Sequence, residues 1–169
     1  CKAPGRVVKQ TSFRDPRVRV AVAVNPVTNP IFSSRSMTRV QVPMLVIAGM
    51  KDVFAPPVSQ QLTPFTSLRQ PGSLLAVQNN GTHLSFLDAT ANLPEVITGP
   101  DQSLARQQLR GMAKLFFDRH LLGQTTTPEL APEGNGAFQT GSSPLPLLLR
   151  SSLTTQQLEQ AEPGLREVP

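Results

Sequence analysis

Two side chains that could do acid–base chemistry each follow the end of an apolar run. Asp52 stands three residues after the glycine that ends VPMLVIAG, and His83 follows LLAVQNNGT. A carboxylate that accepts the Nδ1 hydrogen of an imidazole fixes the tautomer of the ring, and Nε2 can then take a proton from a nucleophile. The two residues therefore predict an acid–histidine pair. Taken alone, Asp52 could instead cap the next helix, and His83 could be a structural loop residue.

Other polar residues are open to a second interpretation. Asp88 follows the histidine by five residues and is an alternative acid, although a role in tying down the loop is favoured. His120 lies in the last turn of a predicted helix, where packing and the helix dipole suit it. Asn25 follows another strand and either faces a substrate or simply forms a turn before a proline. Residues 84–87 either line an acyl pocket or anchor the loop, and anchoring is favoured.

Three apolar segments predict the strands that position these residues. Residues 18–24 alternate valine with arginine or alanine, which indicates a strand that ends at an Asn-Pro turn. Residues 43–48 and 73–77 contain almost no polar side chain, as is typical of strands buried on both faces. In an open α/β sheet, functional residues lie at the carboxyl ends of strands. Asp52 and His83 are therefore expected at the same edge.

Helical patterns separate and follow these strands. The segment PPVSQQLTPF has apolar residues at helical spacing, and Pro64 is expected to shorten or kink that helix. The clearest helix is expected from Asp101, as N-cap, to about Leu122, with Gly123 ending it and an apolar stripe that includes Phe117. The alternation of strand, helix, strand, loop and long helix predicts an α/β fold with an open, mostly parallel sheet.

These segments resemble parts of the α/β-hydrolase superfamily. VPMLVIAGMKDVFAPP resembles the segment that presents the triad acid, and NNGTHLSFLD resembles the loop that carries the triad histidine. LARQQLRGMAKLFFDRHLLG looks like the closing helix of dienelactone-hydrolase-like and platelet-activating-factor-acetylhydrolase-like members. Together with VAVNP and PLLLRSSLTTQQLEQ, these segments are similar to a group of cyanobacterial hydrolases. The order of acid and then histidine is also that of the superfamily.

The resemblance implies Asp52 and His83 as catalytic residues of a serine hydrolase. Its substrates would be carboxylic esters, lactones or similar small acyl compounds, and the mechanism needs neither cofactor nor metal. The nucleophile motif G-x-S-x-G does not occur in the sequence. The chain is therefore expected to be the C-terminal portion of a doubly wound α/β-hydrolase sheet, incomplete and inactive alone. The nucleophile would lie in the N-terminal remainder of the same polypeptide. The alternative is a non-catalytic α/β-hydrolase-like binding or structural module.

The composition predicts a domain followed by a tail, and it argues against nucleic acid or a membrane span. Residues 1–123 are expected to belong to the hydrolase domain, and residues 124–169 to form a tail rich in Pro, Gly, Ser and Thr with one short helix at SSLTTQQLEQA. The net charge is +5 and the pI about 10.4, yet the arginines are scattered and Tyr and Trp are absent, which argues against a nucleic-acid partner. One cysteine permits no internal disulfide, and no apolar stretch approaches the roughly 18 residues of a membrane span.

Overall fold

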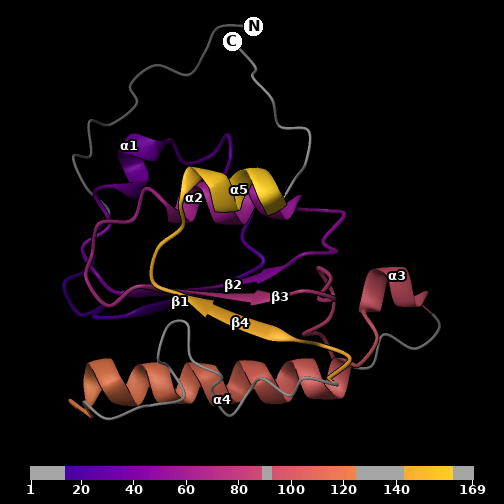
Figure 1. The fold of residues 1–169 in the computed structure, drawn as a ribbon. Helices are drawn as coiled ribbons and strands as arrows, with labels where there is room; N and C mark the ends of the chain where they lie inside the picture. The colour runs from indigo at the N-terminus through magenta and orange to yellow at the C-terminus, as the bar shows by residue number, and fades with distance from the viewer. Residues whose placement is uncertain (1–13, 89–92, 125–142, 162–169) are drawn as a thin grey trace, which may run out of the picture.

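The structure, a computed structural model, describes residues 14–88, 93–124 and 143–161. Its centre is a four-stranded sheet in the order β1-β2-β3-β4 (Figure 1). The strands are β1 (Ala21–Val24), β2 (Met44–Gly49), β3 (Leu74–Gln78) and β4 (Leu147–Arg150). The first three are parallel and β4 runs antiparallel to β3. The fold is thus mixed α/β with an open, mostly parallel sheet, as the sequence pattern predicts.

The first strand is shorter than predicted. Its pairing with β2 begins at Ala21 opposite Met44, whereas the sequence predicts a strand from Val18. The amide of Ala21 donates to the carbonyl of Pro43 at 3.0 Å. Pro43 has no N–H and cannot donate a hydrogen bond to the first strand, so the ladder does not extend past it. Val18 is accordingly 49% exposed. The other two predicted strands agree with β2 and β3 to within one residue at each end.

The strand β4 is missing from the sequence prediction, which treats its residues as part of a tail. Leu147 and Leu149 of this strand are buried, and they enter the core from the free side of β3. The short helix expected after it is confirmed as α5 (Thr155–Ala161). Its N-terminus is capped reciprocally, because Thr154 Oγ1 accepts from Gln157 N at 3.2 Å while Gln157 Oε1 accepts from Thr154 N at 2.9 Å.

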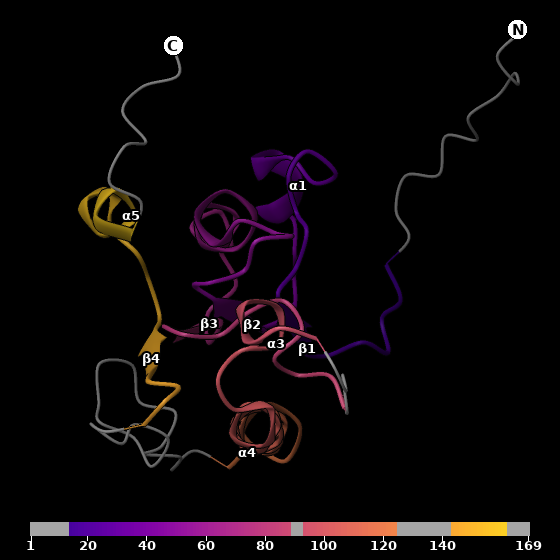
Figure 2. The same cartoon turned by 90° about the vertical axis from the view of Figure 1, so that its right-hand side faces the viewer.

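Helices cover both faces of the sheet (Figures 1 and 2). One face carries α4 (Gln102–Leu121), and the other carries η1 (Val58–Leu62, a π-helical turn), α2 (Thr63–Phe65) and α5, with α1 (Ser34–Met37) nearby. The short α3 (Glu95–Thr98) lies beyond the carboxyl ends of β2 and β3 (Figure 1). Alternate residues of β2 point to opposite layers, so Leu45 and Ile47 pack under α4 while Val46 and Ala48 pack under η1 and α2.

The long helix α4 begins where the sequence predicts. Asp101 is its N-cap, with a side-chain oxygen 2.8 Å from the amide of Leu104. Its buried face consists of Ala105, Gln108, Met112 and Phe116. The prediction that Phe117 belongs to the core is wrong: its position is turned by one residue from the buried stripe, and it is 37% exposed.

The helix predicted after Asp52 is confirmed in its interrupted form. The turn η1 is π-helical, with the amide of Thr63 bonded to the carbonyl of Val58, and α2 continues for three residues around Pro64. Proline cannot donate an intrahelical hydrogen bond, so the segment does not propagate as a regular α-helix. The turn η1 carries Gln61 to the side chain of Asp52.

Candidate active site

Asp52 is held in a tight turn after β2. Its amide bonds to the carbonyl of Gly49 at 3.1 Å, and its Oδ1 accepts from the amides of Phe54 and Ala55 at 2.9 and 2.8 Å. This is the local bonding that favours aspartate in turns. The carboxylate is completely shielded from solvent. Because Oδ1 is occupied by two backbone donors, Oδ2 is left to face other segments of the chain.

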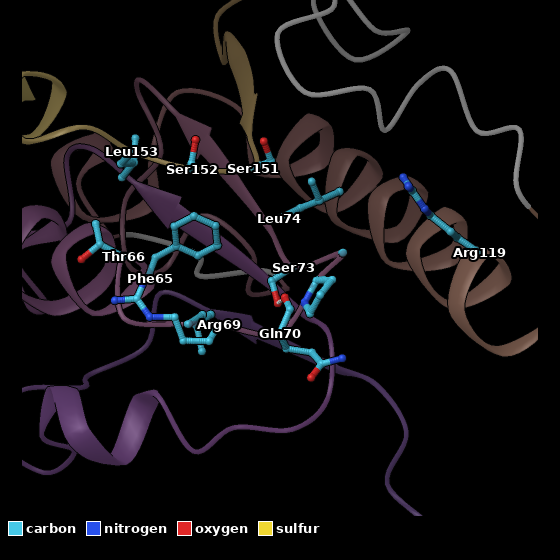
Figure 3. A pocket seen from close by; sticks show the side chains of 13 residues that line it. Phe65, Thr66, Arg69, Gln70, Ser73, Leu74, Arg119, Ser151, Ser152 and Leu153 are labelled. Atoms are coloured by element: carbon cyan, nitrogen blue, oxygen red, sulfur yellow. Dashed lines mark hydrogen bonds between the residues drawn. The ribbon is translucent and has the colours of Figure 1, made fainter.

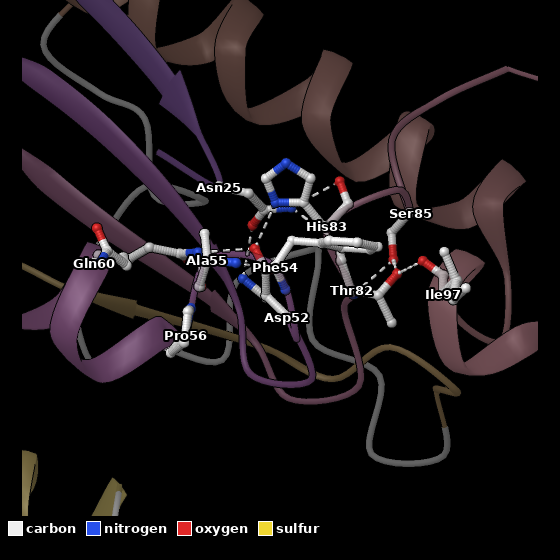
Figure 4. A network of polar contacts seen from close by, with 12 residues as sticks. Asn25, Asp52, Phe54, Ala55, Pro56, Gln60, Thr82, His83, Ser85 and Ile97 are labelled. Atoms are coloured by element: carbon white, nitrogen blue, oxygen red, sulfur yellow. Dashed lines mark hydrogen bonds and ion pairs between the residues drawn. The ribbon is translucent and has the colours of Figure 1, made fainter. Parts of the chain in front are cut away.

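His83 meets that second oxygen. Its Nδ1 lies 2.8 Å from Asp52 Oδ2, and its side chain retains 30% of its exposure (Figure 4). An ionised carboxylate can only accept, so in this contact Nδ1 carries the hydrogen and Nε2 is left with a lone pair. No residue in the described parts of the chain hydrogen-bonds to Nε2. The expected approach of the two residues is therefore confirmed, in the geometry that general-base chemistry requires.

A side-chain amide also donates to the carboxylate. Gln61 Nε2 donates to Asp52 Oδ2 at 3.0 Å and to the carbonyl of Ala55 at 3.0 Å, and Gln61 is 1% exposed. The π-helical turn η1 places this residue. The sequence analysis missed it, although a glutamine in an otherwise apolar helical stripe, nine residues after the acid, is a polar residue at a core position and could have signalled a partner.

The loops that bear the pair are pressed together. The amide of Lys51 bonds to the carbonyl of Gly81 at 2.8 Å, and the amide of Met50 bonds to the carbonyl of Gln78 at 3.0 Å. A Cβ at Gly49 would lie 2.7 Å from the Gly81 oxygen, closer than real Cβ atoms come. Glycines at both positions allow the two backbones to touch, and this contact brings Asp52 within reach of His83.

Hydroxyl groups brace the histidine loop from its other side (Figure 4). Ser85 Oγ accepts from the amide of Thr82 at 2.8 Å, and Thr82 Oγ1 bonds to the carbonyl of Ile97 in α3. Ser85 and Thr82 are both buried. Within the segment 84–87, Phe86 packs against the core under α4, whereas Leu87 is 49% exposed. The segment therefore anchors the loop at least in part, which is the role that the sequence favours for it.

Asp88 and His120 form no hydrogen bond with the acid–histidine pair, whereas Asn25 contacts its loop. Asp88 is 86% exposed at its side chain and pairs with Arg106 at 3.4 Å, so it ties down the loop and does not meet His83. His120 packs edge-to-face on Phe116, with ring centroids 4.5 Å apart. Burial, and then the positive charge of Arg119, lowers the pKa of His120. Asn25 is 4% exposed, and its side-chain amide donates to the backbone carbonyl of His83.

An aromatic side chain stands beside the imidazole. Phe54 lies in the Asp52 turn, its ring centroid is 5.7 Å from that of His83, and the two planes are inclined by 57°. Phe54 is 59% exposed and its neighbour Val53 is 63% exposed. An exposed apolar surface thus borders the imidazole ring.

The pocket of Figure 3 lies away from this pair. It has a volume of about 490 Å³ and is lined by residues such as Ser73, Leu74 and Ser151, at the amino end of β3 and the end of β4. Asp52 and His83 follow the carboxyl ends of β2 and β3. The pocket is therefore at the opposite end of the sheet and supplies nothing to the acid–histidine pair.

The described residues contain neither a cluster of metal-ligating side chains nor a membrane-spanning helix. Within residues 14–88, 93–124 and 143–161, no group of three His, Cys, Asp or Glu side chains could hold a metal ion. In those same ranges no helix combines the length and the apolar character needed to cross a bilayer.

Comparisons with protein-family models, with curated proteins and with solved structures found no match to this chain.

Proposed function

We propose that this chain supplies the acid and the general base of a serine hydrolase. Asp52 orients His83 and stabilises its charged form, and His83 Nε2 accepts the proton of an attacking hydroxyl. The observation that carries the proposal is the 2.8 Å contact between Nδ1 and Oδ2, with the carboxylate buried and Nε2 unengaged by any described residue. The resemblance of the Asp52 and His83 segments to α/β-hydrolases supports the same assignment.

The proposed reaction is acyl transfer to water. A serine outside the described residues attacks the carbonyl carbon of an ester or lactone while Nε2 takes its proton. The alkoxide leaving group receives that proton, and a covalent acyl-enzyme is left. Water then attacks the acyl group and gives a proton to Nε2, which passes it to the departing serine oxygen, and the carboxylic acid is released. In our proposal the serine belongs to the same longer polypeptide, on the N-terminal side of this chain.

The test measures hydrolysis of p-nitrophenyl acetate and butyrate by the polypeptide that contains this chain. We expect His83→Ala and Asp52→Asn each to lower kcat by roughly 10⁴-fold or more, since removing either partner disables the general base. His120→Gln is the matched control, because it changes the other histidine of the chain without touching the pair, and it should retain the wild-type rate. Near-normal hydrolysis by His83→Ala would sink the proposal.

A fluorophosphonate probe, which labels activated serines, distinguishes the second candidate function. One feature favours a non-catalytic module: the sequence lacks a G-x-S-x-G elbow. Labelling of one serine that is lost in His83→Ala supports the enzyme. If the wild-type polypeptide shows neither labelling nor hydrolysis, the non-catalytic module is favoured.

A further inference from the structure

Asn25 adopts an unusual backbone conformation directly after β1. Its φ is +44°, the left-handed region, and no other non-glycine residue in the described ranges has a positive φ. Asparagine tolerates this conformation better than most residues. Its amide nitrogen still bonds to the carbonyl of Ile47 at 2.8 Å. The sheet ladder therefore reaches Asn25, and the chain then turns sharply so that the side chain points over the end of β2.

The carboxamide of Asn25 bonds to both loops of the acid–histidine pair. Its Oδ1 accepts from the amide of Gly49 at 2.9 Å, and its Nδ2 donates to the carbonyls of Thr82 and His83 at 2.9 and 3.3 Å. The orientation of the group is fixed by these partners, because a flipped amide would set its oxygen against two carbonyls. One side chain directly after β1 thus joins the start of the Asp52 turn to the backbone of His83 itself.

We propose that Asn25 is a positioning residue for the Asp52–His83 pair, acting through the backbone of His83. Its side-chain hydrogen bonds go to backbone atoms and not to the carboxylate or the imidazole, so it is not a catalytic residue. The inference rests on the proposed function of that pair. Its physical basis is that β1 and β3 are not neighbours in the sheet, so no strand pairing joins the His83 loop directly to the end of β1. The buried amide does so, and a misplacement of about 1 Å in such a site can cost about 10²-fold in rate.

The test reads the tautomer of His83 by long-range ¹H–¹⁵N spectra of the full chain labelled with ¹⁵N-histidine. The chain has two histidines, so a His120→Gln background leaves His83 as the single labelled ring. In the wild-type pair the proton should reside on Nδ1 and exchange slowly with solvent. Asn25→Gly keeps the left-handed backbone and removes all three amide contacts. We expect it to give a mixture of tautomers and to raise exchange of the Nδ1 proton by about tenfold or more.

Asn80→Gly is the matched control. Asn80 lies in the same loop and also donates to a backbone carbonyl, that of Pro144 at 2.9 Å, but this contact leads to the β4 side and not to β1. Both glycine variants should lower the melting temperature, and only Asn25→Gly should change the His83 signals. A wild-type tautomer and exchange rate in Asn25→Gly, with a loss of melting temperature like that of Asn80→Gly, would show a merely structural role and overturn the inference.

A second variant covers the case in which Asn25→Gly does not fold. Asn25→Asp tolerates the same backbone and keeps the acceptor for Gly49, but when ionised it cannot donate to Thr82 or His83. It should disturb the His83 tautomer in the same direction, and unchanged His83 signals would again overturn the inference. In a polypeptide that hydrolyses esters, both variants should lower kcat with little change in KM. A mixed tautomer in the wild-type chain would refute the pair itself, and the proposed function with it.

Discussion

The two oxygens of the Asp52 carboxylate accept hydrogen bonds from several parts of the chain. Two backbone amides, the Gln61 amide and the imidazole of His83 all point at its two oxygens. A buried charged group without such partners would be strongly destabilising. At the residue scale, the turn, the π-helical segment and the histidine loop therefore form one polar unit. We therefore expect the loss of any one donor to weaken the hydrogen bonding of the carboxylate.

The two ends of this unit could be predicted from sequence, whereas its supports could not. Asp52 and His83 each lie within five residues of the end of an apolar strand, and parallel neighbours end at the same edge. Gln61 and Asn25 owe their roles to partners that only the folded chain brings near. The sequence shows that Asn25 follows a strand, but its contact with the His83 loop crosses over the end of β2, and no local pattern contains that contact.

His120 gives a prediction that depends on pH. Its pKa in the folded state is lowered by burial first and by Arg119 second, against a hydrogen bond with the Gly72 backbone. The unfolded chain, with an ordinary histidine pKa of about 6.5, binds the proton first as the pH falls. We therefore expect the stabilising contribution of neutral His120 to be complete above about pH 6.5 and to be lost as the pH falls toward the lower folded pKa.

The measurement compares wild type with His120→Gln in thermal melts between about pH 5 and about pH 8, a range that brackets the ordinary histidine pKa. Glutamine does not titrate, so the variant should show a shallower loss of melting temperature on acidification. His83 is present in both proteins and drops out of the difference. Identical pH profiles would contradict the prediction.

At the scale of elements, the contact between the turns after β2 and β3 is set by backbone and not by side chains. Gly49 and Gly81 lie so close that no Cβ fits between them. The sequence shows a glycine in each strand-exit turn, which indicates turns but does not reveal that the two glycines face each other. The same limit applies to η1: Pro64 predicts an interrupted helix, and only the structure shows that the interruption aims Gln61 at Asp52.

Gly49→Ala should separate these turns. Its Cβ would meet the Gly81 carbonyl oxygen at 2.7 Å and the Thr82 amide nitrogen at 3.2 Å, and backbone atoms cannot rotate away. We expect a loss of about 1–3 kcal/mol in the free energy of unfolding, measured by urea titration. The shift of the loop should also weaken the bond between His83 and Asp52, seen as a mixed tautomer in the histidine spectra.

Gly123→Ala is the control for that substitution. It also destabilises, by about 1–2 kcal/mol, because alanine is strained at a φ of +70°. A Cβ at Gly123, however, would have no atom of the described residues within 4 Å apart from its own chain neighbours. The two alanine variants should therefore lose similar stability, while only Gly49→Ala alters the His83 signals. A normal tautomer in Gly49→Ala would show that the close contact is not needed to hold the pair.

At the scale of the molecule, the two sides of the sheet differ. In the described parts of the chain, β1 has a pairing partner on one side only, whereas β3 is covered on its far side by β4. The sequence analysis missed β4 because four residues after a proline-rich stretch are too few to show a period, and their partner lies far back along the chain. The strand nonetheless places Leu147 and Leu149 in the core under α4.

Adjacent leucines of β4 provide the test of its part in the fold. Leu149 is 3% exposed and packs with the α4 layer, while Leu148 is only partly buried on the opposite face. Leu149→Ala should lower the free energy of unfolding by about 2–5 kcal/mol, since it opens a cavity in the core. Leu148→Ala deletes the same atoms from a less buried position and should cost less than half as much. Equal losses in the two variants, measured by urea unfolding, would mean that β4 does not seat its alternate residues in the core.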